Sequence, residues 1–372
     1  MFEETRPYND SEIPAAISRL ASHPYFPIVC SYLFPHQEIG YLRTEFSKIT
    51  SVKEFQDKVM YKLLTATIEK TTAGFSYSGT EGLSDSNKCT FIGNHRDIVL
   101  DASLLQYALY CSNLDTSEIT FGDNLMKGDF VTDFGKINKM FRIVRGGNIR
   151  DFYKNSMEVS SYMRYAITEK NQSTWIAQRN GRTKDGLDKT EPGVLKMLAM
   201  SSDKDFVENL TELNLTPVAI SYEYESCDFL KTQELYVSRY QQYQKAPNED
   251  FNSILRGITQ PKGQVSMVIT PSITKEELEK CDLFQKSEKY NILAKIIDKR
   301  IIRNYRLYKN NYIAYDLLQD NPVFSNNYTA AEKNNFIEYM HSGIDKIMGD
   351  KDELTAIFLG IYANPVKNML MH

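Results

Sequence analysis

The sequence predicts an α/β fold, in which a mixed, largely parallel sheet is flanked by helices. Between residues 88 and 270, short apolar runs alternate with helix-like segments, as expected for strands joined by helices. On both sides of this region, apolar residues recur at helical spacing. We therefore expect an N-terminal helical cap at 1–80, an α/β core at 81–274, and a C-terminal helical extension packed on the core at 275–372.

Composition narrows the class of protein. The 372 residues are enough to bury a sizeable core, and the net charge of -4 argues against a nucleic-acid partner. The five cysteines include no C-x-x-C pair, so neither a zinc site nor a disulfide framework is indicated, and a reducing compartment fits. The first ten residues are polar and acidic, unlike a secretory signal. No apolar run approaches the roughly 20 residues of a spanning helix, so we expect a protein that is cytoplasmic or peripheral to a membrane.

The expected elements follow from the hydrophobic pattern. Before the core, an amphipathic segment at 46–68 predicts a long helix, and the Gly- and Ser-rich stretch at 71–87 predicts a turn-laden connection. The core is predicted to contain strands at 89–93, 118–122, 141–146, 174–178, 215–222 and 264–270. Its predicted helices lie at 98–110, 149–168, 193–200 and 205–213, with Asp205 capping the last. Beyond the core, a Ser or Thr cap with an acidic first turn opens the helices of the extension.

Two kinase-like tripeptides are present, HRD at 95–97 and DFG at 133–135. In protein kinases an asparagine follows the HRD aspartate by five positions and binds a metal ion. Here that position is Ala102, and neither a glycine-rich loop nor a lysine-bearing strand precedes the HRD. A protein kinase is therefore excluded.

His95 is the candidate catalytic residue. It stands where a predicted strand meets a predicted helix, with Asp97 and Asp101 close by in the sequence. A histidine oriented by a carboxylate can take the proton from an attacking hydroxyl, and histidine exchanges protons near neutral pH. A histidine that only caps the helix is the alternative interpretation of these residues taken alone.

Four blocks in fixed order favour the catalytic interpretation. They are NHRDIVLD at 94–101, FRIVRGG at 141–147, WIAQRNGRTKDG at 175–186 and LTPVAISYEY at 215–224. This core resembles the glycerolipid acyltransferase family, whose blocks are H-x-x-x-x-D, F-I-x-R, E-G-x-R-S and an apolar strand with a proline near its start. The resemblance covers roughly 88–273 and leaves the helical ends unexplained.

The resemblance implies roles for individual residues. His95 would be the general base and Asp101 its orienting partner. Asp97 is the alternative partner, because five residues separate His95 from Asp101 where the family has four. Backbone N–H groups at the start of the following helix would hold the oxyanion. No metal is implied.

The second and third blocks would bind the acceptor. Basic side chains just past strand ends suit an anionic headgroup. Gln178 is nearest to the position of the family's glutamate in the third block, which leaves the identity of the acceptor open. The residues expected to bind the acceptor are Arg145, Arg179, Gly181, Arg182, Thr183 and Lys184.

The implied activity belongs to phospholipid biosynthesis. A fatty acyl group would move from a thioester donor, acyl-CoA or acyl carrier protein, to the hydroxyl of a glycerol-phosphate, lysophosphatidic acid or related lysolipid. The enzyme would carry no bound cofactor and would work as a peripheral protein on the inner face of the membrane. A non-catalytic lipid- or acyl-binding relative and a thioester hydrolase are the alternatives.

Overall fold

A computed structural model describes residues 2–126, 128–144, 146 and 148–371. Its centre is a seven-stranded sheet with the order β1-β7-β6-β2-β5-β3-β4. The strands are Thr72–Ser78 (β1), Thr90–Gly93 (β2), Glu118–Gly122 (β3), Met140–Ile143 (β4), Thr174–Ala177 (β5), Leu215–Tyr222 (β6) and Gly263–Ile269 (β7). The predicted α/β class is confirmed.

Strand direction determines where a site can form. β2 is parallel to both β5 and β6, and β3 is parallel to both β4 and β5. Only β7 and its parallel neighbour β1 run the other way, because β7 is antiparallel to β6. The carboxyl ends of β2 to β6 therefore meet at one edge of the sheet, where α/β proteins bind their ligands.

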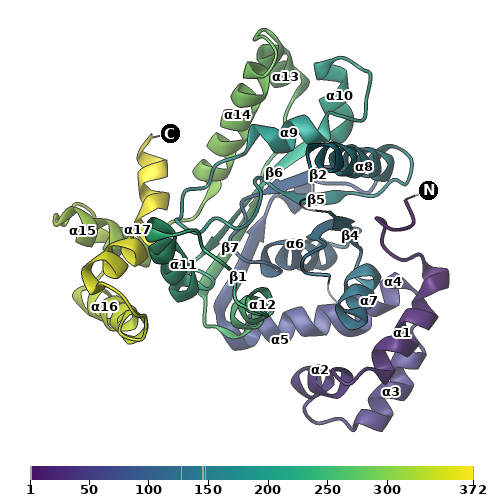
Figure 1. Cartoon of the computed structure of the whole chain (residues 1–372), viewed down its shortest axis with the longest axis horizontal. Helices are drawn as coiled ribbons and strands as arrows, with labels where there is room; N and C mark the ends of the chain where they lie inside the picture. The colour runs from purple at the N-terminus through teal and green to yellow at the C-terminus, as the bar shows by residue number, and fades with distance from the viewer. Residues whose placement is uncertain (1, 127, 145, 147, 372) are drawn as a thin grey trace.

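Helices cover both faces of the sheet (Figure 1). One apolar cluster joins strand residues such as Ile92 and Ala219 to five helices. A second cluster, with Phe91 and Val218, lies on the other face against Leu100–Cys111 (α6). Neighbouring residues of one strand thus enter opposite clusters, as the two-residue period of a strand requires. The five helices are Ile149–Thr168 (α8), Pro192–Leu198 (α9), Phe206–Leu213 (α10), Lys275–Asp282 (α13) and Glu288–Asn304 (α14).

The N-terminal cap is helical up to residue 71 and has its own apolar cluster. That cluster also includes Ile137 from Asp129–Ile137 (α7), which fixes the cap to the core. The expected connection at 71–87 contains strand β1, in which Phe75 and Tyr77 pack against the second apolar cluster of the sheet. The cap helices are Ile13–Ser22 (α1), Phe26–Leu33 (α2), Ile39–Ser47 (α3), Val52–Phe55 (α4), the π-helix Gln56–Met60 (η2) and Tyr61–Thr71 (α5).

The C-terminal extension packs against helix Asp228–Tyr240 (α11), which follows β6. Besides α13 and α14, which pack on the sheet, the extension contains Lys309–Gln319 (α15), Ala330–Ile344 (α16) and Lys351–Met371 (α17). Pro365 inside α17 removes the backbone N–H that would bond to the carbonyl of Ile361. Gly186 lies against that carbonyl so closely that a Cβ there would be 2.2 Å from the Ile361 oxygen. The extension therefore touches the loop that follows β5.

Over the part of the chain that the structure describes, no helix is both long enough and apolar enough to cross a membrane.

Candidate active site

The turn between β2 and α6 begins with Asn94, whose side chain extends the sheet. Its amide nitrogen donates to the carbonyl of Ile220 at 3.0 Å, and its oxygen accepts from the Ile220 N–H at 2.8 Å. Gly93 just before it is tightly packed, because a Cβ there would lie 3.2 Å from Nε1 of Trp175. These contacts fix the point at which the chain leaves the sheet, and His95 is the next residue.

His95 and Asp101 are hydrogen-bonded across this turn. Nδ1 of the imidazole lies 3.0 Å from Oδ2 of Asp101, and both residues are buried. The same oxygen accepts the backbone N–H groups of Arg96 at 2.6 Å and Asp97 at 2.8 Å. The turn at 95–99 thus accommodates the five residues between His95 and Asp101, one more than in the family, and still brings Asp101 to the imidazole.

Asp97, the alternative partner, has a different position. Its Oδ1 accepts the N–H groups of Val99 at 2.9 Å and Leu100 at 2.8 Å, so it caps α6. The hydroxyl of Ser226 donates to its other oxygen. Of the two carboxylates, Asp101 is the one bonded to the imidazole.

Four N–H groups in the turn and at the start of α6 already have acceptors. Those of Arg96 and Asp97 donate to Asp101, and those of Val99 and Leu100 donate to Asp97. These four groups are therefore occupied by the carboxylates that build the turn, and an oxyanion hole at this helix start stays a prediction for the other N–H groups of its first turn.

Tyr222, at the end of β6, completes the arrangement. Its hydroxyl donates to Oδ1 of Asp101 at 2.8 Å, and its ring is fully buried. Burial and the neighbouring Asp101 carboxylate raise the pKa of Tyr222 well above its usual value. The sequence marked this tyrosine only as a strand residue, and no local pattern distinguishes it from other strand tyrosines.

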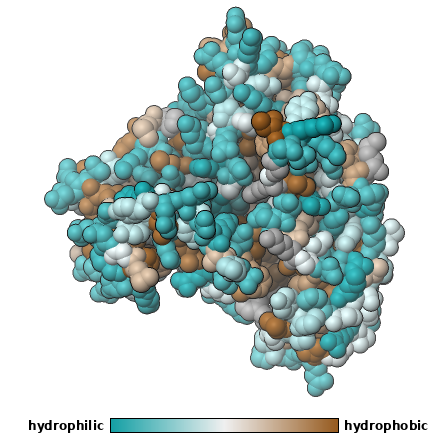
Figure 2. Space-filling model, in the orientation of Figure 1, coloured by the Kyte–Doolittle hydropathy of each residue, from teal (hydrophilic) through white to brown (hydrophobic). Residues whose placement is uncertain are grey.

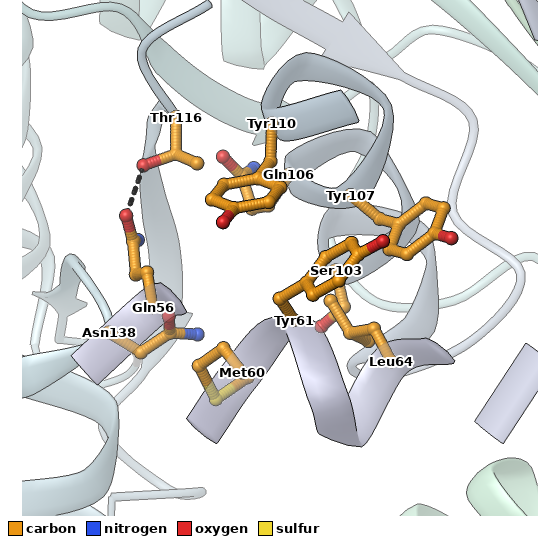
Figure 3. Close-up of a pocket in the computed structure, with 10 residues that line it drawn as sticks. All are labelled: Gln56, Met60, Tyr61, Leu64, Ser103, Gln106, Tyr107, Tyr110, Thr116 and Asn138. Atoms are coloured by element: carbon orange, nitrogen blue, oxygen red, sulfur yellow. Dashed lines mark hydrogen bonds between the residues drawn. The ribbon is translucent and has the colours of Figure 1, made fainter. Parts of the chain in front are cut away.

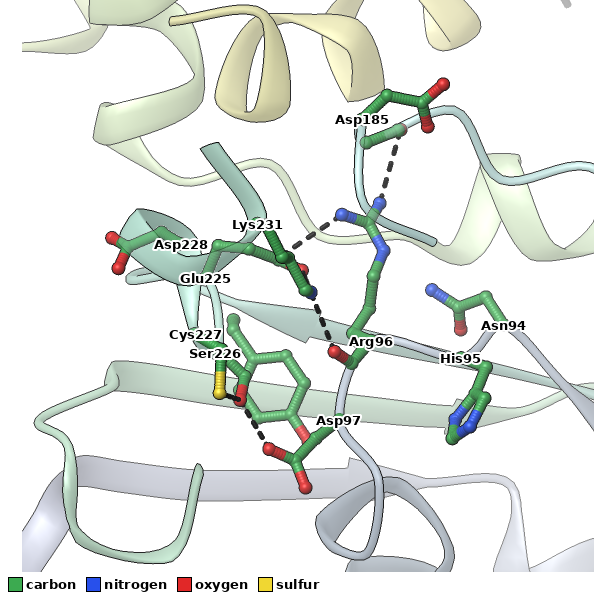
Figure 4. Close-up of polar contacts among 12 residues, drawn as sticks. Asn94, His95, Arg96, Asp97, Asp185, Glu225, Ser226, Cys227, Asp228 and Lys231 are labelled. Atoms are coloured by element: carbon green, nitrogen blue, oxygen red, sulfur yellow. Dashed lines mark hydrogen bonds and ion pairs between the residues drawn. The ribbon is translucent and has the colours of Figure 1, made fainter. Parts of the chain in front are cut away.

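Arg96 points away from His95 into a buried ionic cluster (Figure 4). Its guanidinium contacts Asp188 at 2.6 Å and Glu225 at 3.1 Å. Lys231 in turn donates to Glu225 at 2.6 Å and to the Arg96 carbonyl at 2.7 Å. Burial opposes the charge on Arg96, but the two carboxylates hold its pKa above the usual value. The cluster ties the turn after β2 to the loop after β5 and to α11.

The loop after β5 carries most of the residues expected to bind the acceptor. The Thr183 N–H donates to the His95 carbonyl at 2.6 Å, which places this loop beside the histidine. Gly181 has a φ of 74°, a left-handed conformation that favours glycine. Lys184 is ion-paired with Glu234. Arg145 lies outside the described residues.

Several buried polar atoms of this loop have no hydrogen-bond partner among the described residues. They are Nε2 of Gln178, Nε of Arg179, Nη1 of Arg182 and Oγ1 of Thr183. Buried polar groups are nearly always paired in folded proteins, so these unpaired donors and acceptors mark a place for a polar ligand or ordered water in the loop after β5.

Comparison with known proteins gives a distant likeness. No family model matches the sequence, and no curated protein matches it. Among solved structures, the chain is similar to the 1-acyl-sn-glycerophosphate (LPA) acyltransferase PlsC from Thermotoga maritima, with a TM-score of 0.39 and 12% sequence identity. The match covers 79% of this chain and 94% of that chain. A likeness this distant leaves the argument about function to the side chains described above.

A separate pocket lies between the cap and α6 (Figure 3). Gln56, Met60 and Tyr61 line it on one side, and Gln106, Tyr107 and Tyr110 of α6 on the other. Gln56 accepts the Thr116 hydroxyl at 2.9 Å across one end. The pocket has space for little more than a water molecule, so it does not accommodate a fatty acyl chain.

In the described part of the chain, no three or more His, Cys, Asp or Glu side chains are grouped so that they could hold a metal ion.

Proposed function

We propose that this protein is an O-acyltransferase that moves a fatty acyl group from a thioester to the hydroxyl of a glycerol-phosphate or lysolipid. The observation that carries the proposal is the hydrogen bond between His95 Nδ1 and Asp101, at the edge where five strands end. The other three blocks that resemble the glycerolipid acyltransferase family support it as well, because they lie outside the turn that carries this bond.

The chemistry follows from the tautomer that this bond selects. With Nδ1–H donated to Asp101, the other ring nitrogen is left unprotonated and can accept the proton of the acceptor hydroxyl. The hydroxyl oxygen then attacks the thioester carbonyl, and the carbon–sulfur bond breaks. The imidazolium gives its proton to the departing thiolate, which leaves as the free thiol. Asp101 stabilises the imidazolium formed in between, as in serine hydrolase triads.

The acceptor would be anionic. Arg179 and Arg182 each have a buried guanidinium nitrogen without a partner among the described residues, and an arginine fork suits a phosphate. The Thr183 hydroxyl, also unpartnered and fully buried, could donate to the same headgroup. Lys184 contributes less to this proposal, because Glu234 already neutralises it. Such an enzyme would take its lipid from the cytoplasmic side of a membrane.

The test is thiol release from acyl-CoA and from acyl carrier protein, with glycerol 3-phosphate and a panel of lysolipids as acceptors. We expect turnover with acylated product visible by mass spectrometry, and its loss in His95→Ala. His341→Ala, at an exposed histidine of α16, is the matched control and should keep the wild-type rate.

Three results would count against the proposal. Absence of turnover with every donor would favour a non-catalytic lipid- or acyl-binding protein. Loss of donor without acylated product would indicate a thioester hydrolase. A full rate in His95→Ala would refute the proposed general base.

A further inference from the structure

Helix Glu249–Thr259 (α12) is amphipathic, and its apolar side is only partly covered, because Ile254 and Ile258 are half-buried. It buries Ser253 and Gly257, whereas Phe251 and Leu255 are 47% and 46% exposed. Phe251 and Leu255, which we call the α12 strip, belong to no apolar cluster of the described chain, neither those on the sheet nor those of the cap and the C-terminal helices. A helix that packs on a protein core normally does the reverse.

Contacts at the candidate active site impose this orientation. A Cβ at Gly257 would be 2.2 Å from Oδ2 of Asp97, so only glycine allows the helix to approach the turn that carries Asp97. Cys227 at the start of α11 donates its thiol to the Ser253 carbonyl at 3.3 Å. The face of α12 that meets Asp97 and Cys227 is therefore small and polar, and Phe251 and Leu255 remain exposed beside it.

A second exposed apolar strip begins α8, which follows β4. Ile149, Phe152 and Tyr153 are 90%, 64% and 60% exposed, at the spacing of one helix face. They also lie outside the apolar clusters. Because β4 ends at the same edge of the sheet as β2, the chain leaves the sheet toward α8 at the edge where His95 lies, and α12 reaches that edge through its contact with Asp97.

The charges beside the two strips favour an anionic surface. Arg150, Lys154 and Arg256 are exposed among the apolar side chains. Among the acidic neighbours, Asp250 is ion-paired with Lys245, whereas Asp151 and Glu249 accept hydrogen bonds from uncharged donors only, within the described residues. Three exposed basic side chains therefore lie beside two carboxylates that have no ion pair there, a small excess of positive charge. Basic residues next to apolar side chains are typical of segments that lie in the headgroup region of a bilayer.

We propose that α12 and the first turns of α8 dock on an anionic phospholipid bilayer, with the site edge facing the lipid. The proposal rests on the proposed function, since a lysolipid acceptor must pass from a membrane to His95. Figure 2 shows apolar side chains in small separate groups on a mostly hydrophilic face, unlike the broad apolar surface of a permanent protein interface. A few inserted side chains give weak, reversible membrane binding.

Vesicle sedimentation tests the proposal without any acyl donor, so it is independent of catalysis. Full-length protein is mixed with phosphatidylcholine vesicles, alone or with phosphatidylglycerol. We expect binding that is stronger with phosphatidylglycerol, and about tenfold weaker after Phe251→Ser with Leu255→Ser, or after Ile149→Ser with Phe152→Ser. Leu283→Ser, at an 82% exposed leucine that ends α13, is the matched control and should bind like the wild type.

Four results separate the possibilities. Variants that lose vesicle binding but keep wild-type turnover of a water-soluble, short-chain acceptor would support docking as a separate function of this edge. Wild-type protein that stays in solution with both vesicle types would overturn the proposal. Equal binding by wild type and both double variants would overturn it in favour of another surface. A wild-type dimer in light scattering that the double variants dissociate would overturn it in favour of a second copy as the occupant.

Discussion

The hydroxyl of Tyr222 donates to Oδ1 of Asp101 at 2.8 Å, while the other carboxylate oxygen of Asp101 contacts His95. The two oxygens of one carboxylate therefore join a strand residue to the candidate base. Asp101 is almost completely buried, so without these donors its charge would be poorly stabilised. Tyr222 is a positioning residue in this arrangement, because it acts on His95 only through Asp101.

Removing the Tyr222 hydroxyl should change the pH dependence of the reaction. In Tyr222→Phe, Asp101 loses a donor, holds the imidazolium more strongly, and the acidic limb of the kcat/KM profile should move to higher pH. Stability should fall by about 1–3 kcal/mol, the cost of an unpaired buried acceptor. Tyr162→Phe breaks a similar buried bond, 2.5 Å from the Tyr162 hydroxyl to Glu118. This control should lose stability without any shift in the profile, and an equal shift in both variants would refute the positioning role.

Asp101 and Asp97 should differ in their effect on rate. Asp101→Asn disturbs the orientation and tautomer of His95, so kcat should fall by about 10²- to 10⁴-fold with little change in KM. Asp97→Asn keeps an oxygen that can cap α6, so we expect a modest loss of stability and a smaller loss of rate. Steady-state kinetics on both variants checks this. A larger loss of kcat in Asp97→Asn would reverse the assignment.

Arg182 and Lys184 should differ in their effect on acceptor binding. Arg182→Met removes a partly unpaired guanidinium, and KM for an anionic acceptor should rise by about ten- to a hundredfold. Lys184→Met removes a charge that Glu234 already neutralises, so KM should change less than threefold or so. Initial rates with glycerol 3-phosphate and with an uncharged monoacylglycerol distinguish a charge effect from a general loss of activity. Equal effects of Arg182→Met on both acceptors would contradict an anion site.

Asp228 should make the free energy of unfolding depend on pH. Burial raises the pKa of its carboxyl from 3.8 to about 6, although the hydroxyls of Tyr362 and Tyr339 donate to it and oppose the shift. The folded state therefore favours the protonated form. The stabilisation that Asp228 adds to the free energy of unfolding is complete below about pH 3.8 and is lost as the pH rises through about 6. Its full size is about 3 kcal/mol.

Asp228→Asn tests this contribution, because an amide does not titrate. Between pH 4 and pH 7, the unfolding free energy of the wild type should fall relative to that of the variant, as measured by urea denaturation. Parallel pH profiles for the two proteins would show that Asp228 does not titrate in this range.

Local features of the fold could be predicted because they depend on neighbours in the chain. The buried strands that lead to the site follow from apolar runs, and the helix caps follow from side chains next to the backbone that they bond. Asp205 accepts from Val207 and Glu208, and Thr274 forms a capping box with Glu277, both as predicted. A turn that carries His95, followed by a helix that carries Asp101, was predictable in the same way.

Elements that depend on contacts with distant parts of the chain, such as β1 and α12, were not predicted. β1 is a short edge strand in a Gly- and Ser-rich stretch. Its two aromatic residues, Phe75 and Tyr77, do not predict a strand locally and are explained only by their packing against the sheet. Helix α12 has a clear apolar face, but periodicity does not say whether that face meets the core or solvent. Its contact with Asp97 through Gly257 decides the question.

The sequence by itself determined the α/β class, the strand–turn–helix unit and the candidate base His95, since these depend on hydrophobic period and local hydrogen bonds. Only the tertiary structure decided that Asp101, and not Asp97, contacts the imidazole. It also brought in Tyr222 from β6 and enclosed Arg96 between Asp188 and Glu225. The physical reason is that a buried charge must find partners wherever the fold brings them, and the spacing of residues along the chain does not specify those partners.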